Sequence, residues 1–199
     1  MKAALLIVGL GNPGSEYEGT RHNFGSLVVT RLAEKHGLSF QSKRKWRGRG
    51  AVGEIESEQV LLLQPATFMN ESGLSVAAAL REEELTPSEL LVVVDDVELP
   101  LGKLRMRTEG ASGGHNGLKS VEAYLGTREY VRLRLGVGRG GEDLAEYVLG
   151  RFSSEEQKAL PEVVEKAVRA IEIWIEQGNN SAMRFVNASN PSTGVKDGA

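Results

Sequence analysis

The sequence predicts a single-domain α/β protein with a mixed, mainly parallel central sheet, and three observations lead to this fold class. Continuous apolar runs at Ala3–Val8 and Leu90–Val94 are typical of strands buried on both faces. Segments with apolar residues at helical spacing alternate with the predicted strands along the chain. The 199 residues suit one domain, and no internal repeat or linker divides them.

The first half of the chain contains two predicted helices and a hairpin. The spacing of apolar residues predicts a helix from His22 to about Lys35, and Gly37 then supplies a favourable C-terminal cap. Gly50–Ile55 and Val60–Leu63 read as two strands of a hairpin. The Ala-rich segment Thr67–Leu80 predicts the second helix.

The buried strand Leu90–Val94 follows a turn or short capped helix at Thr86–Glu89. It ends in two acidic residues, Asp95 and Asp96, which strand alternation sends to opposite faces. Further strands are expected at Leu101–Arg107 and Val131–Val137.

A glycine-rich loop and a helix over Asn116–Leu125 separate these last two strands. Glu155–Gln177 predicts a long amphipathic helix, and Ser181–Asn187 predicts a short last one. We therefore expect one domain over residues 1–188, followed by a loose tail over residues 189–199 that is rich in Ser, Gly, Pro and Asn.

Composition excludes several classes of protein. The chain has no Cys, which rules out disulfides, thiolate metal centres and cysteine nucleophiles, and its three His residues leave few metal sites possible. No apolar run reaches the ~18 residues of a membrane-spanning helix. The apolar N-terminal run lacks a cleavage site and continues into Gly-Asn-Pro-Gly, so a core strand is the better interpretation and a cytoplasmic protein is expected.

Charge is unevenly distributed. Residues 1–139 carry 18 Lys and Arg against 17 Asp and Glu, whereas residues 140–199 carry 6 against 10. One basic run spans Lys43–Arg49, and a second series comprises Arg105, Arg107, Lys119, Arg132, Arg134 and Arg139. Local basic stripes favour phosphate binding more than the net charge of −3 opposes it, although solvated loop charge is the usual explanation for one short run.

Two glycine-rich segments match motifs whose context is wrong. Gly9–Gly14 fits the dinucleotide-binding pattern, but it leads into a turn rather than directly into a helix, and no strand ending in an acid follows at the required distance. Gly110–Gly114 fits the elbow of serine hydrolases around Ser112, but the only later His, His115, leaves no room for the acid between them.

A set of polar residues at the ends of elements favours hydrolysis of an ester or amide. His22 and His115 each precede an Asn, and Asp95 ends a buried strand where it could orient one of these bases. The side-chain amides of Asn12, Asn70 and Asn116 could support a developing oxyanion. Each Asn alone is more typical of a turn or cap; the combination favours a water-activating hydrolase.

The same residues resemble the bacterial peptidyl-tRNA hydrolase family. The matching segments occur in family order over roughly residues 3–188: Ile7–Gly14, Thr20–Gly25, Pro65–Asn70, Asp95 with Leu99-Pro100, Gly113–Lys119 and Arg132–Gly136. The resemblance implies a monomeric three-layer α/β/α fold that hydrolyses the ester between tRNA and a peptide or other N-blocked aminoacyl group, recycling tRNA from aborted or stalled translation.

The resemblance also implies roles for particular residues. His22 corresponds to the base that activates water, Asp95 to the acid that stabilises it, and Asn12 to the residue that distinguishes blocked from free aminoacyl groups. Substrate contacts are implied for Tyr17, Phe68, Asn70 and Asn116. Arg107 and Arg134 correspond to basic positions that grip the 5′ phosphate of the tRNA acceptor end.

No metal, cofactor, membrane or obligate protein partner is expected for this activity. Two other functions remain compatible with the residues. One is an RNA-binding protein without catalysis, which would not need the combination of His22 and Asp95. The other is a serine esterase that uses Ser112.

Overall fold

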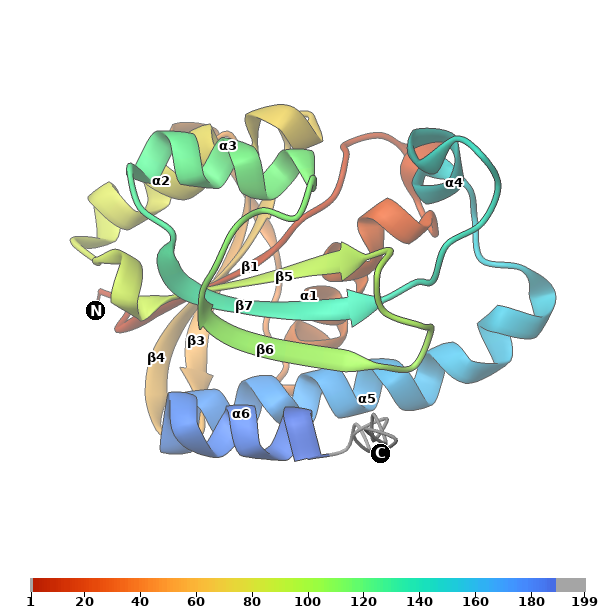
Figure 1. Cartoon of the computed structure of the whole chain (residues 1–199). Helices are drawn as coiled ribbons and strands as arrows, with labels where there is room; N and C mark the ends of the chain where they lie inside the picture. Colours follow the sequence, from red (N-terminus) through yellow and green to blue (C-terminus); the bar gives the residue numbers. More distant parts are fainter. Residues whose placement is uncertain (1, 189–199) are drawn as a thin grey trace, which may run out of the picture.

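A computed structural model describes residues 2–188 as a seven-stranded sheet between two layers of helices (Figure 1). The strands are β1 (Leu5–Gly9), β2 (Gln41–Lys43), β3 (Gly48–Ile55), β4 (Glu58–Pro65), β5 (Leu90–Asp96), β6 (Leu104–Glu109) and β7 (Glu129–Gly136). The helices are α1 (Phe24–Lys35), α2 (Ser72–Glu83), α3 (Asn116–Leu125), α4 (Leu144–Leu149), α5 (Ser154–Gln177) and α6 (Asn179–Ala188). The single-domain α/β fold class is confirmed. The predicted tail over residues 189–199 lies outside the described residues.

The sheet is mixed, with its parallel strands at the centre. Its order is β2-β3-β4-β1-β5-β7-β6, and the pairs β4–β1, β1–β5 and β5–β7 are parallel. Only β3 and β6 run against the other strands, because β2–β3, β3–β4 and β6–β7 are antiparallel pairs. The chain adds β4 on one side of β1 and β5 on the other, so the carboxyl ends of β1 and β5 flank the crevice where open α/β sheets bind ligands.

Each face of the sheet has its own apolar core. Ile7, Leu91 and Leu133 pack with α1, α5 and α6 on one face. Leu61 and Val92 pack with α2 and α3 on the other. Because successive strand residues point to opposite faces, the continuous apolar runs of β1 and β5 serve both cores.

Two glycines allow α1 to lie directly against the centre of the sheet. A Cβ on Gly25 would come within 2.1 Å of the Val93 carbonyl oxygen, and one on Gly9 within 2.5 Å of the Gly25 carbonyl oxygen. This close approach places the start of α1 beside the carboxyl end of β5.

The boundaries of several predicted elements need correction. His22 lies in a 3₁₀ turn, Arg21–Asn23, before α1 begins at Phe24. The second helix begins at Ser72, after the 3₁₀ turn Met69–Glu71. β6 begins at Leu104 because Gly102 adopts the positive φ of a turn. The turn at Pro87–Glu89 has the capping box that its sequence predicts.

Two elements had no sequence prediction. β2 is polar and mostly exposed, lies at one edge of the sheet and ends at Lys43, where the basic run begins. The short helix α4 has no buried residue of its own. Among the described residues, no helix is both long and apolar enough to cross a membrane.

Candidate active site

A cavity of about 630 Å³ opens at the carboxyl ends of β1 and β5. It is lined by eight of the nine site residues predicted from the sequence: Asn12, Tyr17, His22, Phe68, Asn70, Asp95, Asn116 and Arg134. Phe68 is 57 % exposed at its mouth, whereas Asp95 is only 3 % exposed at its base. The ninth residue, Arg107, lies outside the cavity on the exposed side of β6.

His22 is held against Asp95 at the base of this cavity. Nδ1 of His22 lies 3.0 Å from Oδ1 of Asp95 and 3.1 Å from Oδ2. Because an ionised carboxylate only accepts hydrogen bonds, Nδ1 of His22 carries the proton and donates it. Nε2 is then left with its lone pair, as a general base requires.

His115 makes a second contact with the same carboxylate. Its Nε2 lies 2.9 Å from Oδ1 of Asp95, and the two imidazole rings are 4.9 Å apart between centroids. Its Nδ1 accepts from the backbone N–H groups of Gly117 at 3.1 Å and Leu118 at 3.3 Å, which makes it the N-cap of α3. Since those backbone groups can only donate, His115 must be protonated on Nε2, and it donates that hydrogen to Asp95.

This tautomer argues against a metal centre. His22, Asp95 and His115 form the one group in the described part of the chain whose donor atoms could meet around an ion, all lying within 4.8 Å of one another. Binding through Nε2 of His115 would move its proton to Nδ1, where two backbone N–H groups already point. The three side chains therefore suit a hydrogen-bonded base better than a metal site.

Burial raises the pKa of the Asp95 carboxyl, but the electrostatic attraction and hydrogen bonds of His115 and His22 outweigh burial and hold this pKa well below its usual range. Asp95 is therefore ionised at neutral pH and keeps the proton of His22 on Nδ1. The neighbouring Asp96 lines the same cavity, but its Oδ2 lies 3.5 Å from NH1 of Arg134 and makes no contact with His22.

The amide of Asn12 has a defined orientation. Its Oδ1 accepts from the backbone N–H of Met69 at 2.8 Å, so its NH₂ group is the part available to the cavity. Asn23 fixes the Asn12 backbone on both sides, since its Oδ1 accepts from Asn12 N and its Nδ2 donates to Asn12 O, each at 2.9 Å. Asn12 therefore presents a hydrogen-bond donor on a rigid loop beside His22.

Four arginines share one face of β6 and β7. Cross-strand pairing places Arg105 opposite Arg134 and Arg107 opposite Arg132. Arg134 is the member that reaches the cavity, where it donates to the Ala111 carbonyl at 2.8 Å. Arg132 is 1 % exposed, whereas Arg105 and Arg107 are exposed. We call these four residues the arginine ladder; the basic run Lys43–Arg49 lies at the opposite edge of the sheet.

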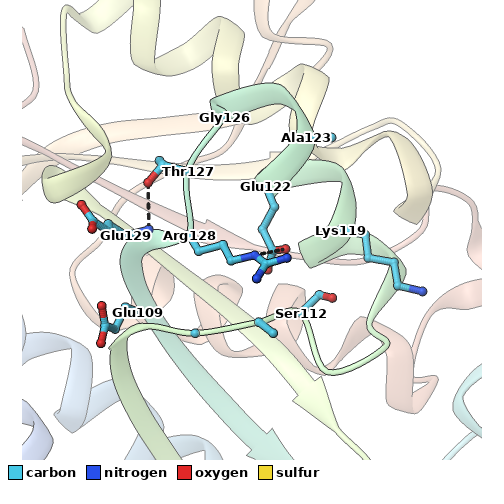
Figure 2. A pocket seen from close by; sticks show the side chains of 11 residues that line it. Glu109, Ser112, Lys119, Glu122, Ala123, Gly126, Thr127, Arg128 and Glu129 are labelled. Atoms are coloured by element: carbon cyan, nitrogen blue, oxygen red, sulfur yellow. Dashed lines mark hydrogen bonds and ion pairs between the residues drawn. The ribbon is translucent and has the colours of Figure 1, made fainter.

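Ser112 lies on the loop that joins β6 to α3. It lines a separate depression, shown in Figure 2, together with Glu109 at the end of β6 and Glu129 at the start of β7. Its lining residues include no histidine, and an ion pair between Arg128 and Glu122 crosses its wall. The depression therefore offers Ser112 no histidine as a base, which argues against a serine esterase with a histidine base.

Comparison with known proteins agrees with this geometry. A sequence model of the family described as peptidyl-tRNA hydrolase matches residues 6–194. The chain belongs to the peptidyl-tRNA hydrolase family.

Individual relatives cover nearly the whole chain. The peptidyl-tRNA hydrolase of Chloroflexus aggregans is 46 % identical over 185 residues, which cover 92 % of this chain and 98 % of the relative. That of Desulfitobacterium hafniense is 44 % identical, with coverage of 92 % and 98 %. A crystal structure of peptidyl-tRNA hydrolase from Acinetobacter baumannii superposes with a TM-score of 0.88 at 37 % identity and covers 94 % of this chain and 96 % of the other.

For this member of the peptidyl-tRNA hydrolase family, sequence reasoning left out part of the cavity. Leu144, Ala145, Val148 and Leu149 of α4 form an apolar wall. The sequence carries no signal for α4, because a six-residue helix without a buried face has no clear apolar periodicity.

His115 stood out in the sequence beside Asn116, but its contact with Asp95 depends on how α3 meets β5.

Proposed function

We propose that this chain hydrolyses the ester that joins a peptide, or another N-blocked aminoacyl group, to the 3′ ribose of tRNA. The observation that carries the proposal is the contact of His22 with Asp95, which leaves Nε2 of His22 unprotonated at the base of a cavity that Asn12 also lines. The molecule acts as a monomer in the cytoplasm, where it recycles tRNA from stalled or aborted translation without an obligate protein partner.

The reaction needs a base and a donor to the carbonyl. Nε2 of His22 takes a proton from water, and the water oxygen forms a bond to the ester carbonyl carbon. The bond to the ribose oxygen then breaks, and that oxygen takes up the proton from His22. A positioned base contributes about 10²–10⁴ in rate.

Asp95 stabilises the imidazolium that forms on His22, and His115 keeps Asp95 oriented. The amide NH₂ of Asn12 supports the developing oxyanion, a contribution of about 10²–10³. Asn70 is the alternative donor for the same oxygen, since it lines the same cavity.

Asn12 also distinguishes blocked from free aminoacyl groups. Its NH₂ group offers a hydrogen to the carbonyl of a peptide or acetyl group, because its oxygen is already occupied by Met69. A free α-amine is charged and offers no acceptor, so it leaves this donor unpaired.

The tRNA is bound through phosphate contacts rather than through base sequence. Arg134 and Arg107 grip the 5′ phosphate of the acceptor end, and Tyr17, Phe68 and Asn116 contact the acyl group or the terminal nucleotide. Backbone contacts of this kind weaken steeply with salt.

The deciding experiment measures release of an N-acetyl-aminoacyl group from tRNA in EDTA, with tRNA binding followed in parallel. We expect the wild type to turn over and His22→Ala to lose about 10²–10⁴ in turnover while it still binds tRNA. His36→Ala is the matched control, because His36 pairs with Glu172 at 2.9 Å and does not line the cavity.

Wild-type protein that binds tRNA without releasing the acyl group would show an RNA-binding protein and contradict the proposal. Ser112→Ala completes the test, since loss of turnover in this variant would favour the serine esterase instead.

A further inference from the structure

The outer wall of the catalytic cavity is a helix with little support of its own. α4 spans six residues, none of them buried, and its residue Leu149 is 43 % exposed. Gly138 and Gly141 precede it with positive φ, and Gly150 follows it. Its main packing contact with another element is with the 3₁₀ turn Arg21–Asn23, so the position of the wall depends on that turn.

Arg21 makes this contact with a nearly buried guanidinium. The residue is 9 % exposed, and its NH1 donates to the Arg151 carbonyl at 2.9 Å and to the Tyr147 carbonyl at 3.4 Å. Its NH2 donates to Glu156 Oε2 at 2.6 Å. The end of α4 and the start of α5 are thus both held by one side chain.

The flat face of the guanidinium is used as well. It lies 4.2 Å from the centre of the Tyr147 ring and 5.4 Å from that of Phe152. The hydroxyl of Tyr147 donates to the Val137 carbonyl at 2.7 Å, and this bond links α4 to the start of the loop that follows β7. The backbone joins the same parts, since Arg21 N donates to Gly150 O at 3.0 Å.

Arg21 directly precedes His22 in the same turn, yet the two side chains contact different parts of the molecule. His22 contacts Asp95, and Arg21 contacts α4 and α5. From this arrangement we infer that Arg21 is a positioning residue that fixes the α4 wall of the cavity that His22 also lines, and so sets the affinity for the acyl part of the substrate. This inference rests on the proposed function.

An arginine suits this role better than a lysine. Only the guanidinium can stack on a ring with its plane while its edge donates to two carbonyls and a carboxylate. Arg21→Lys keeps a charge for Glu156 and loses the stacking plane. Compared with Arg21→Ala, we therefore expect Arg21→Lys to regain more of the wild-type thermal stability than of the wild-type substrate affinity.

The experiment compares Arg21→Ala and Arg21→Lys with the wild type. For Arg21→Ala we expect KM for an N-acetyl-aminoacyl-tRNA to rise about tenfold, with kcat within about threefold and the Kd for uncharged tRNA unchanged. Arg31→Ala is the matched control, since Arg31 pairs with Glu165 at 2.6 Å and joins α1 to α5 outside the catalytic cavity.

Amide hydrogen exchange supplies a readout that does not need activity. Exchange over residues 144–151 is expected to accelerate in Arg21→Ala and to stay at the wild-type rate in Arg31→Ala. Should Arg21→Ala fail to fold, Tyr147→Leu removes the stacked ring from the other side and is expected to raise KM in the same way.

A fall in kcat with unchanged KM would reveal a loss of folded enzyme only, and would overturn the inference. Unchanged exchange over residues 144–151 would overturn it as well. Failure of the wild type to release the acyl group would contradict the proposed function instead, and the exchange measurement would still decide the role of Arg21.

Discussion

Asp95 is the residue on which both cavity histidines depend. It is buried, it accepts from His22 and His115, and its pKa lies well below the usual range because those two contacts outweigh burial. If activity falls as the pH is lowered towards 5, protonation of Asp95 is therefore not the cause. Replacing this carboxylate changes the tautomer of His22 while leaving the cavity in place.

Asp95→Asn is expected to lower kcat by about 10²–10⁴ and to leave the Kd for tRNA unchanged, because the arginines proposed to bind tRNA lie on β6 and β7. Steady-state kinetics with a parallel binding titration checks this. A loss confined to tRNA binding would contradict the role of Asp95. Glu172→Gln is the matched control, since this buried carboxylate pairs with His36 at 2.9 Å and does not line the cavity.

The same carboxyl gives a prediction for stability against pH. Its pKa is lower in the folded protein than the ordinary value of about 3.9, so the unfolded chain binds the extra proton first. The stability that Asp95 contributes is present above pH ~4 and is lost as the pH falls further. Urea unfolding between pH 2.5 and 5 should therefore show a shallower pH dependence for Asp95→Asn than for the wild type; equal slopes would contradict the assignment.

Residue identity was predictable at this scale, and orientation was not. Types and places at element ends select two histidines, Asp95 and three asparagines as candidates, and only the family resemblance assigns His22 as the base and Asn12 as the selective amide. That Asn12 presents its NH₂ group depends on the Met69 N–H, and that His115 donates to Asp95 depends on two amides of α3. Local sequence does not fix such contacts between distant segments.

At the scale of elements, β6 and β7 place like charges opposite each other. Two pairs of arginines stand directly opposite each other in the register, which destabilises a sheet unless anions are near. Oδ2 of Asp96 lies 3.5 Å from NH1 of Arg134, and Oε1 of Glu122 lies 3.8 Å from NH2 of Arg132. Arg105 and Arg107 remain exposed on β6, and a phosphate is the anion that the proposed substrate would supply.

Arg105→Ala is expected to raise KM for peptidyl-tRNA as much as Arg107→Ala, because the register makes Arg105 the direct neighbour of Arg134. kcat should be unchanged, and each substitution should reduce the salt dependence of tRNA binding by about one phosphate contact. Kinetics and binding at several salt concentrations check this, with Arg81→Ala on α2, outside both basic stretches, as the control. If KM and the salt slope are untouched, the ladder does not grip tRNA.

The elements that sequence predicted are those with a buried face. β1, β5 and α5 supply long apolar patterns, whereas β2 is polar and α4 has no buried residue. The two missed elements are held by neighbours instead, β2 by pairing with β3 and α4 by Arg21.

At the scale of the whole molecule, one sheet joins two apolar cores. The alternation of strands and helices predicted the α/β class, and the family resemblance implied the layers, but the strand order that brings β1 beside β5 follows from tertiary pairing. Each core contains one of the two tryptophans: Trp174 packs on the α5 face and Trp46 on the α2 face. Because β1 and β5 contribute side chains to both cores, each layer of helices packs on the same strands as the other.

The layers should therefore unfold together. Ile171→Ala removes a fully buried side chain from the α5 core and is expected to cost about 2–5 kcal/mol in the free energy of unfolding. In this background, the single-tryptophan proteins made by Trp46→Phe or Trp174→Phe should each be followed in urea by fluorescence and by far-UV circular dichroism. Within each protein the two signals should share one midpoint, lowered from that of the matching parent without Ile171→Ala. If Trp46 kept its parental midpoint while Trp174 shifted, the two layers would unfold separately, and the shared strands would not couple them.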